Sequence, residues 1–433
     1  MKILLVGNGA REHVLAEAIA KDAELYAVME KKNPAIAALS KKFWITDIHN
    51  PRAVTDAVKA ERIDVAFASP DAVIAAGVSD ALAALGIKVA SPTKNACRIE
   101  WDKSYARMLM DKYKIGCNPR HVLATNIAEA ENAINTYGKV AVKPLGLTGG
   151  KGVKVSGDHL RNTEEAISYA AEVIGKEGRV LIEEKLEGEE FSLFGFSDGK
   201  KIVFTPPVQD HKRAFAEDKG PNTGGMGSYS TGGLLPFMKP GDLKAAQKTM
   251  EQTIFAMAKE NNPFVGVLYG GFIICRDGIK LIEYNARFGD PEAMNVVPLL
   301  DGSLSSVFLS MAEGKLGNKK IKFTDKCTVL KYLVPEGYPG KSVKDAEVIV
   351  DKKSIESSGA HIYYAAVYEK DGKVYTTSSR AFGMLGIADN LEKAEQIAEN
   401  ACGFVKGPLW HREDIGTSVL IEKRIKHIGE IRG

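Results

Sequence analysis

The sequence lacks the features of a secreted, membrane-spanning or nucleic-acid-binding protein. Its opening apolar run, Met1–Val6, stops at Gly7 and is too short for a signal peptide. No stretch reaches the roughly 18 consecutive apolar residues that a membrane helix needs. No run of five basic residues occurs, and a net charge of +3 is too small to indicate nucleic acid or a membrane surface. We therefore expect a cytoplasmic protein with neither among its partners.

Cysteine is scarce and scattered. The number of cysteines is odd and no CxxC pair occurs, which argues against both a disulfide framework and a zinc site. No Ser-His-Asp or Cys-His order stands out either, so we do not expect covalent catalysis by the protein. We predict reduced thiols at all five positions, which are Cys97, Cys117, Cys275, Cys327 and Cys402.

Composition and length are those of a folded multidomain protein. Hydrophobic residues make up 45% and charged residues 26% of the 433 residues. A chain of this length is expected to form about two to four domains. Residues 1–101 alternate short apolar strand patterns with helical ones, which predicts a parallel, doubly wound α/β sheet. Its strands are expected at 3–6, 25–29, 65–68 and 88–90.

The sequence pattern of residues 102–433 indicates two further units. Residues 102–322 read as an α+β unit whose small lobe covers about 118–188, and residues 323–433 read as a strand-rich domain with a late helix at 391–405. Within the second unit, Gly271–Cys275 and Ile279–Asn285 are joined by Asp277-Gly278, a strong hairpin signal. Residues 209–233 are expected to form a long loop, and loops of that length are usually functional.

The first glycine motif is Gly7-Asn8-Gly9-Ala10-Arg11-Glu12, directly after the first strand. A dinucleotide-binding turn would carry glycine or alanine where Glu12 stands, and its charge would repel a pyrophosphate. A tight strand-to-helix turn is therefore favoured over an NAD site. A third possibility is a helix N-terminus that holds one phosphate or another polar substrate group.

The second glycine motif runs from Lys143 to Gly152 and has the sequence KPLGLTGGKG. It is no Walker A loop, because Lys151 precedes glycine rather than Ser or Thr and a strand follows. Between two strands, such a loop is typical of a flap whose amides close on phosphates, and Lys143 could reach phosphate from the strand before it. The alternative is a hairpin loop kept soluble by lysine.

Glu283 and Asn285 form a candidate metal pair. Residues two apart on a strand face the same side, and carboxylate and amide oxygens suit Mg²⁺ that also holds phosphates. If the pair stood alone, a half-exposed edge strand with its polar residues facing out would be the favoured explanation. Beside a phosphate flap, we favour metal binding.

Two further segments suit an anionic substrate. Gln209-Asp210-His211-Lys212-Arg213 is followed by a glycine-rich stretch, residues 220–227, with many free amides. Arg287 precedes the turn at Asp290-Pro291 and is placed to clamp a carboxylate or phosphate. The alternative is a solvated charge run beside a flexible loop.

Together these segments resemble one family along essentially the whole chain. The motifs are GNGAREH at 7–13, SPT at 91–93, GLTGGKGV at 146–153, QDHKR at 209–213, GPNTGGMGSYS at 220–230, EYNARFGDPE at 283–292 and EDIG at 413–416. In this order they resemble the phosphoribosylamine–glycine ligases of the ATP-grasp superfamily. The segments at 220–230 and 283–292 carry most of the specificity.

The resemblance implies an architecture and a reaction. It implies a biotin-carboxylase-like domain at 1–101, a two-lobed ATP-grasp unit at 102–322 and a C-terminal domain at 323–433. The implied reaction joins glycine to 5-phosphoribosylamine through glycyl phosphate, giving glycinamide ribonucleotide, ADP and phosphate in purine biosynthesis. It needs ATP with Mg²⁺ or Mn²⁺. We expect a monomer or a weak homodimer.

The resemblance also assigns roles residue by residue. ATP phosphates would contact Lys103, Lys143 and the flap residues Gly149, Gly150, Lys151 and Gly152. The adenine hinge would comprise Glu183, Glu184 and Leu186, and Glu190 would bind the ribose. The metal ligands would be Glu283 and Asn285. Glycine would face Arg287 and the amides of Asn222, Thr223, Gly224 and Gly225, and the phosphoribosyl group would lie near Asp210, His211, Lys212 and Arg213.

Three positions depart from the family pattern. Many members have Gly-Pro-Glu where this chain has Ser69-Pro70-Asp71, and that glutamate is implied to hold the ribose. Glu100-Trp101-Asp102-Lys103 replaces Glu-Gly-Ser-Lys and keeps the lysine. Gly270 and Gly271 fall where many ATP-grasp enzymes carry a further metal-binding carboxylate. Rival readings are an ATP-grasp ligase with another acceptor, a regulatory nucleotide-binding protein and an NAD-dependent oxidoreductase.

Overall fold

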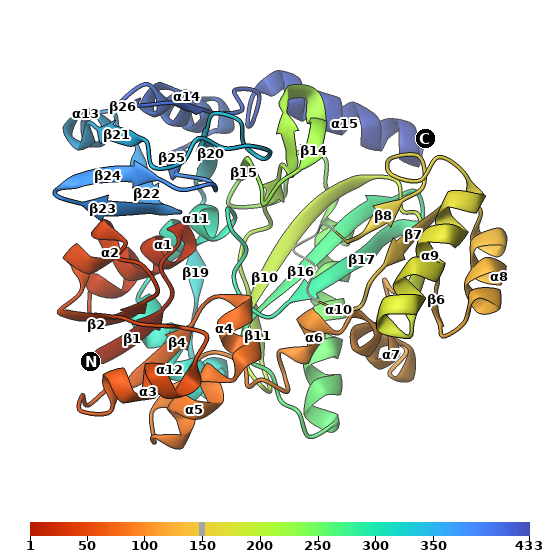
Figure 1. Ribbon diagram of the computed structural model, residues 1–433, viewed down its shortest axis with the longest axis horizontal. Coiled ribbons are helices and arrows are strands. Elements are labelled where there is room, and N and C mark those ends of the chain that lie inside the picture. The colour runs from red at the N-terminus through yellow and green to blue at the C-terminus, as the bar shows by residue number, and fades with distance from the viewer. Residues whose placement is uncertain (147–151) are drawn as a thin grey trace.

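The structure is a computed structural model that describes residues 1–146 and 152–433 (Figure 1). Its N-terminal part is a parallel sheet with the strand order β3-β2-β1-β4-β5. Because β1 is central, the chain winds outward to both sides of it, which confirms the predicted doubly wound sheet. The elements are β1 (Lys2–Val6), α1 (Ala10–Ala20), β2 (Glu24–Met29), α2 (Pro34–Leu39), β3 (Lys42–Ile45), α3 (Pro51–Val58), β4 (Val65–Ala68), α4 (Asp71–Ala76), α5 (Val78–Ala84) and β5 (Lys88–Val89).

Strand β3 was not predicted from the sequence. It is a four-residue edge strand whose Phe43 and Ile45 are 37% and 50% exposed. A short strand that buries so little leaves no burial pattern in its sequence.

The turn after β1 is tight because a glutamate lies beneath it. Gly7 has φ +132°, and a Cβ there would lie 2.6 Å from Glu12 Cγ. Glu12 is buried, and its Oε2 accepts the Gly9 amide at 2.6 Å. A phosphate at this helix start would have to compete with that carboxylate. The geometry agrees with the tight-turn interpretation and counts against the NAD site.

The small lobe has its own sheet and core. Its strands are antiparallel in the order β6-β9-β7-β8, covered by two helices (Figure 1). The apolar side chains between sheet and helices, among them Ile134, Val142 and Ile182, form a separate buried cluster. The elements, with the two helices that lead into the lobe, are α6 (Arg98–Trp101), α7 (Lys103–Lys112), β6 (His121–Ala124), α8 (Ile127–Tyr137), β7 (Val140–Lys143), β8 (Lys154–Val155), α9 (Thr163–Glu177) and β9 (Val180–Glu184).

The large lobe is built on an antiparallel sheet with the order β11-β10-β16-β17. The predicted hairpin is confirmed, with Asp277-Gly278 at its turn, although β16 begins six residues earlier than expected. The elements are β10 (Glu189–Asp198), β11 (Ile202–Phe204), α10 (Pro240–Lys259), β16 (Val265–Cys275), β17 (Gly278–Asn285), α11 (Ala293–Val296), η2 (Val297–Leu299), β18 (Leu300–Asp301), α12 (Leu304–Ala312), η3 (Leu316–Asn318) and β19 (Lys322–Phe323).

The C-terminal part is strand-rich, as predicted, and contains two sheets. One has the order β12-β15-β20-β25-β22 with β27 paired to β20, and the other β23-β24-β21-β26. The late helix α14 ends at Cys402, three residues before its expected end. The elements are β20 (Cys327–Pro335), β21 (Glu347–Val350), α13 (Lys352–Ser357), β22 (His361–Tyr364), β23 (Val367–Lys370), β24 (Lys373–Thr376), β25 (Phe382–Ala388), α14 (Leu391–Cys402), β26 (Val405–Lys406), β27 (Leu409–Trp410) and α15 (Ser418–Arg432).

The segment expected to be a long loop, residues 209–233, contains several short elements. Its two outer strands pair with each other, and β15 pairs with β20, so the segment extends the C-terminal sheet. Its two inner strands form a projecting hairpin. The elements are β12 (Gln209–Asp210), β13 (Arg213–Phe215), the 3-10 turn η1 (Ala216–Asp218), β14 (Lys219–Asn222) and β15 (Gly227–Ser230).

The C-terminal helix α15 was also not predicted. Its apolar residues are spread around the helix, and Val419 and Ile425 are exposed, so the helical period is weak. The helix crosses back over the large-lobe sheet (Figure 1), where Arg432 donates to Asp242 at 2.7 and 2.9 Å. Across the described ranges, no helix is long and apolar enough to cross a membrane.

Candidate active site

A buried carboxylate joins two cations at the inner end of the small lobe. Lys143 ends β7, and its Nζ lies 2.6 Å from Glu183 Oε2. Arg107 Nε donates to the other carboxylate oxygen at 2.6 Å. The side chain of Glu183 is 1% exposed and those of its partners are below 10%. The three groups together carry one positive charge, which remains available for an anionic ligand.

The electrostatics of this group support full ionisation of the carboxylate. Burial alone would raise the pKa of Glu183, but Arg107 and Lys143 lower it to about 2. A buried carboxylate with two such partners holds both cations in place. The predicted adenine contact of Glu183 cannot come from its carboxylate in this arrangement, because both oxygens are engaged.

A β-bulge in β17 turns a carbonyl toward the same cations. The β16–β17 register shifts between Gly271 and Phe272, which leaves Ile282 as the extra residue. Its carbonyl accepts from Arg107 Nη2 at 2.8 Å and from Lys143 Nζ at 3.4 Å. The bulge therefore anchors the two cations to the strand that carries the predicted metal ligands.

Glu283 and Asn285 follow the bulge and come from the same strand face. Glu283 lies opposite Gly271 and Asn285 opposite Tyr269. Tyr284, between them, is buried on the other face against Thr253. Glu283 lines one pocket with Lys103, Arg107 and Glu183.

The donor set fits a divalent ion that is shared with phosphate. The Glu283 carboxylate has no hydrogen-bond or ion-pair partner among the described residues, and Asn285 Oδ1 accepts only a long 3.3 Å bond from Arg287. No group of three or more acidic, histidine or cysteine side chains that could hold a metal occurs in the described part of the chain. Two hard protein ligands, with substrate phosphates completing the shell, are typical of Mg²⁺ sites.

Lys103 approaches the pocket from the start of α7. Its Nζ donates to Gly146 O at 3.1 Å, at the edge of the predicted flap. Burial lowers the pKa of Lys103, while Glu283 opposes that shift. The flap residues Gly149, Gly150 and Lys151 lie outside the described residues. Gly152 is described, and its carbonyl accepts from Tyr169 Oη at 2.7 Å.

The predicted hinge offers main-chain groups rather than side chains. The Glu184 carboxylate is bound by Arg120 through the backbone amide at 2.8 Å and Nε at 2.7 Å. The Leu186 amide has no acceptor among the described residues. Of the three hinge residues, Leu186 is thus the one with a free donor for a base edge.

Arg287 is fixed by a carboxylate from the N-terminal side. Glu100 lies 3.0 Å from its Nη2 and accepts the Ala286 amide at 2.7 Å. Burial opposes the charge of Arg287, but Glu100 and then Asp71 raise its pKa above the usual value. Asp71, the residue that departs from the family pattern, therefore lies on the Arg287 side of the site.

Asp210, Lys212 and Glu190 form a further charged group of the site. Lys212 Nζ lies 3.0 Å from Glu190 Oε2, and the pKa of Lys212 is raised by Glu190 and Asp210. Burial and then Asp210 raise the pKa of Glu292 to about 7. The Lys212–Glu190 ion pair therefore joins the residue predicted to bind ribose to one predicted near the phosphoribosyl group.

The glycine-rich loop offers fewer free amides than its sequence suggests. The Thr223 amide donates to Lys212 O at 2.7 Å, and the Gly225 amide donates to Thr223 Oγ1 at 3.0 Å. Asn222 pairs with Arg213 across the β13–β14 hairpin. The Gly224 amide has no acceptor among the described residues. The loop therefore presents Gly224 rather than a row of amides.

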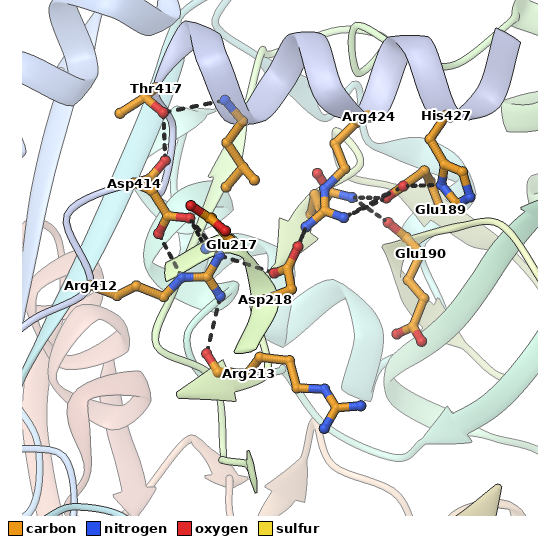
Figure 2. Close-up of polar contacts among 12 residues, drawn as sticks. Glu189, Glu190, Arg213, Glu217, Asp218, Arg412, Asp414, Thr417, Arg424 and His427 are labelled. Atoms are coloured by element: carbon orange, nitrogen blue, oxygen red, sulfur yellow. Dashed lines mark hydrogen bonds and ion pairs between the residues drawn. The ribbon is translucent and has the colours of Figure 1, made fainter. Parts of the chain in front are cut away.

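The hairpin that carries Arg213 and Asn222 is held by the C-terminal segment (Figure 2). Asp218 is bound by Arg412 at 3.0 Å and also by Arg424. Arg412 donates to Asp414 and to the Arg213 carbonyl, and the Arg213 side chain points away from this cluster. The predicted EDIG motif thus contributes Asp414 to a clamp on the hairpin.

His211 is not brought to the side where Asp210 and Lys212 meet Glu190. Its ring is buried against Tyr229, with the centroids 5.9 Å apart. Burial and the nearby Arg412 and Arg424 lower its pKa to about 3, so it is neutral. His211 and Lys212 lie in the link between β12 and β13, where the His211 ring packs toward Tyr229 and Lys212 turns to Glu190. The motif therefore supplies two cations, Lys212 and Arg213, rather than the three expected, and the place of the motif near the phosphoribosyl group stays a prediction.

Comparison with known proteins identifies the family. Models of phosphoribosylglycinamide synthetase match residues 1–100 with the N domain, 101–293 with the ATP-grasp domain and 328–418 with the C domain. The chain is 50% identical to the phosphoribosylamine–glycine ligase of Methanosarcina barkeri, with all of both chains covered. The chain belongs to the phosphoribosylamine–glycine ligase family.

Solved structures agree with this assignment. The phosphoribosylamine–glycine ligase of Thermotoga maritima is 27% identical with a TM-score of 0.81, over 96% of this chain and 100% of that one. The biotin carboxylase domain of the Hydrogenobacter thermophilus 2-oxoglutarate carboxylase has a TM-score of 0.71 at 13% identity, over 99% and 93% of the two chains. The latter likeness confirms the predicted biotin-carboxylase-like fold.

Membership in the phosphoribosylamine–glycine ligase family makes the chain an ATP-dependent carboxylate–amine ligase, as predicted. The individual residue assignments and the domain limits stay predictions. Several residues that organise the site were missed. Arg107 carried a signal, since it follows Lys103 at the i+4 helical spacing that puts two side chains on one face. No local sequence signal marked the three arginines of the C-terminal region, because only the tertiary fold brings them to the site. They are Arg380, Arg412 and Arg424.

Proposed function

We propose that this chain joins glycine to 5-phosphoribosylamine, with ATP converted to ADP and phosphate, in the biosynthesis of purines. The product is glycinamide ribonucleotide. One observation carries the proposal: β17 and its extension bring Glu283, Asn285 and Arg287 in succession beside the Lys143–Glu183–Arg107 group. A metal pair, phosphate-binding cations and a carboxylate clamp are the parts that phosphorylation of a carboxylate needs.

In the proposed mechanism, the protein acts by positioning and charge. Lys103 and Lys143 bind the phosphates of ATP as point charges. Glu283 and Asn285 would hold Mg²⁺ or Mn²⁺, which when bound would supply positive charge to the phosphates. Arg287 and the Gly224 amide orient the glycine carboxylate so that its oxygen faces the γ-phosphate.

Glycyl phosphate is the proposed intermediate. The carboxylate oxygen takes the phosphoryl group and ADP leaves. The amine of phosphoribosylamine then attacks the acyl carbon, the new C–N bond forms, and phosphate departs with the C–O bond pair. Lys212 and Arg213 are assigned to the phosphoribosyl phosphate, and Asp210 orients Lys212. The main chain at 184–186 takes the adenine and Glu190 the ribose.

ADP release with single omissions tests the reaction. Purified protein with ATP, Mg²⁺, glycine and phosphoribosylamine should release ADP, and omission of either acceptor or amino acid should stop turnover. Replacing glycine by alanine serves as the specificity control. Equal turnover with alanine, or with an unrelated amine in place of phosphoribosylamine, would contradict the substrate assignment and favour an ATP-grasp ligase with another acceptor.

Two further expectations belong to the proposal. Replacing Mg²⁺ by Mn²⁺ should sustain turnover, which a metal titration of ADP release would measure. A monomer or weak homodimer in the cytoplasm is expected, and sedimentation velocity across a range of concentrations would test the oligomeric part.

A further inference from the structure

Arg380, from the C-terminal domain, binds two loops that the proposed mechanism uses. We define the substrate loops as residues 222–225 and 287–292. Arg380 Nη1 donates to the carbonyls of Gly224 at 2.7 Å, Gly225 at 3.0 Å and Asp290 at 2.9 Å. Its Nη2 lies 3.1 Å from Asp290 Oδ1. One guanidinium group therefore spans the junction of the two loops.

The guanidinium group is itself held in place. It stacks over Tyr332, with its central carbon 4.4 Å from the ring centroid, and its side chain is 14% exposed. The Tyr332 hydroxyl donates to Asp290 Oδ1 at 2.5 Å. The Arg380 carbonyl accepts the Ala366 amide at 2.9 Å, so its backbone is part of the C-terminal sheet region. Such an anchor can fix the 222–225 loop, where residues 222 and 224 are exposed, against the 287–292 loop, where Phe288 is buried in the core.

The contacts determine which way the glycine peptides face. The peptide after Gly224 is held at its carbonyl by Arg380 and at its amide by Thr223 Oγ1. The peptide after Gly225 is held by Arg380 and, through the Met226 amide, by His211 O at 2.8 Å. Both carbonyls thus point to the C-terminal domain, and the Gly224 amide remains for a ligand.

The two loops also pack directly on each other. Gly225 has φ +109°, and a Cβ there would lie 2.6 Å from Pro291 Cδ. A Cβ on Gly224 would approach Arg380 Cζ to 3.2 Å. The glycines therefore allow the close approach at which one arginine reaches carbonyls of both loops.

We propose that Arg380 is a positioning residue for glycine binding. It sets the Gly224 amide and the turn after Arg287 at a fixed separation, with Nη1 on carbonyls of both loops and Nη2 on the Asp290 carboxylate, an arrangement that the one nitrogen of a lysine reproduces only in part. The inference rests on the proposed function, because glycine is the ligand whose orientation it explains. The hydrogen bonds and the ion pair of the Arg380 side chain go to Gly224, Gly225 and Asp290, and none of these residues is assigned to ATP.

Arg380→Lys and Arg380→Ala would be compared with the wild type in the ADP-release assay. We expect kcat/KM for glycine to fall roughly 100-fold in Arg380→Ala and about 10-fold in Arg380→Lys, the scale expected when reacting groups are displaced by about 1 Å. The KM for ATP should stay within about two-fold of wild type, because Lys103, Lys143 and the metal pair are untouched. Arg432→Ala is the matched control, since it removes another arginine of similar exposure that pairs with a carboxylate, Asp242 in the first turn of α10.

The outcomes separate a positioning role from a structural one. A selective glycine defect that Arg380→Lys partly restores, with Arg432→Ala at wild-type glycine parameters, supports the proposal. The proposal would be overturned if Arg380→Lys kept the wild-type kcat/KM for glycine. It would also be overturned if kcat/KM fell equally for ATP and for glycine in both variants. Arg380→Lys keeps the proposal testable if Arg380→Ala does not fold. If the wild type itself needs no glycine, the proposed function fails independently of Arg380.

Discussion

The nucleotide side and the substrate side of this site are held together in different ways. On the nucleotide side, Lys143 and Glu183 lie on paired strands of the small lobe, and Arg107 reaches Glu183 from α7, the helix that leads into that lobe. On the substrate side, the loops are held by arginines from residues 380–424, far along the chain. The first side is stabilised by the lobe that forms it, and the second depends on the C-terminal domain.

The burial of the two sides explains the difference. The strands β7 and β9 are almost fully buried, whereas β14 of the projecting hairpin is exposed at every residue. A segment with so little buried apolar surface gains little from the hydrophobic effect, so polar anchors must hold it. The comparison therefore predicts separable defects, in ATP binding on one side and in acceptor binding on the other.

The largest expected effect is at the metal pair. Glu283→Ala should lower kcat by roughly 1000-fold or more, because one of two protein ligands of the ion on the phosphates is lost. Circular dichroism should stay unchanged, since the carboxylate makes no described contact. The exposed Glu187, replaced by Ala, is the control. A near-normal rate in Glu283→Ala would rule out the metal assignment.

The next effect concerns how the free energy of unfolding falls at acid pH because of Glu183, on the nucleotide side. The pKa of Glu183 is lowered from 4.5 to about 2 in the fold, so the unfolded chain takes up this proton first. The stabilisation is therefore present above pH 4.5 and is lost as the pH falls toward 2, by about 3 kcal/mol in all. Urea unfolding across this range measures it.

Glu183→Gln should remove that pH dependence and should weaken the fold at neutral pH by about 3 kcal/mol, since two buried cations lose their partner. Its neighbour Glu184, paired with the exposed Arg120, provides the control as Glu184→Gln, for which a smaller change is expected. Identical acid profiles for wild type and Glu183→Gln would show that this carboxylate does not carry the effect.

A smaller effect is expected at the clamp on the hairpin. Asp218→Asn should raise the KM for phosphoribosylamine about 10-fold and lower stability by about 2 kcal/mol, because Arg412 and Arg424 lose a shared charged acceptor. The KM for ATP should not change. Steady-state kinetics with Glu217→Gln, an exposed neighbour on the same turn, provides the control. A rise in the KM for ATP alone would contradict the division into two sides.

The smallest effect tests the departure at Asp71. Asp71→Glu restores the usual family residue and extends the carboxylate by one C–C bond, about 1.5 Å. In steady-state kinetics, we expect the KM for phosphoribosylamine to change two- to three-fold, which corresponds to roughly 0.5 kcal/mol. The effect is small because Glu100 already neutralises Arg287 at 3.0 Å. A change of more than about ten-fold would mean that Asp71 contacts the substrate directly.

Prediction from the sequence succeeded where a few neighbouring residues determine the local structure. Asp277-Gly278 between two apolar runs identified the β16–β17 hairpin, and the alternation of Glu283 and Asn285 identified their common face. It failed where the pattern was weak, as in the exposed edge strand β3 and the helix α15. The bulge at Ile282 was also not predicted, because it can be recognised only from the pairing of β17 with β16.

The same limit applies to the site. Lys143 and Arg287 were found because they stand beside motifs, but the pairing of Lys143 with Glu183 required the small-lobe sheet. His211 was expected to be one of three adjacent cations, but its burial, which the local sequence does not reveal, keeps it neutral.

Residue types and local spacing were sufficient to establish the doubly wound N-terminal sheet, the family and the candidate metal pair, since these depend on residues a few positions apart. Tertiary folding decided how the substrate loops are held. Arg380 meets Gly224 across 156 residues, and Arg424 meets Asp218 across 206 residues. No short-range pattern encodes such contacts, because they exist only after the C-terminal sheet and α15 have packed against the ATP-grasp unit.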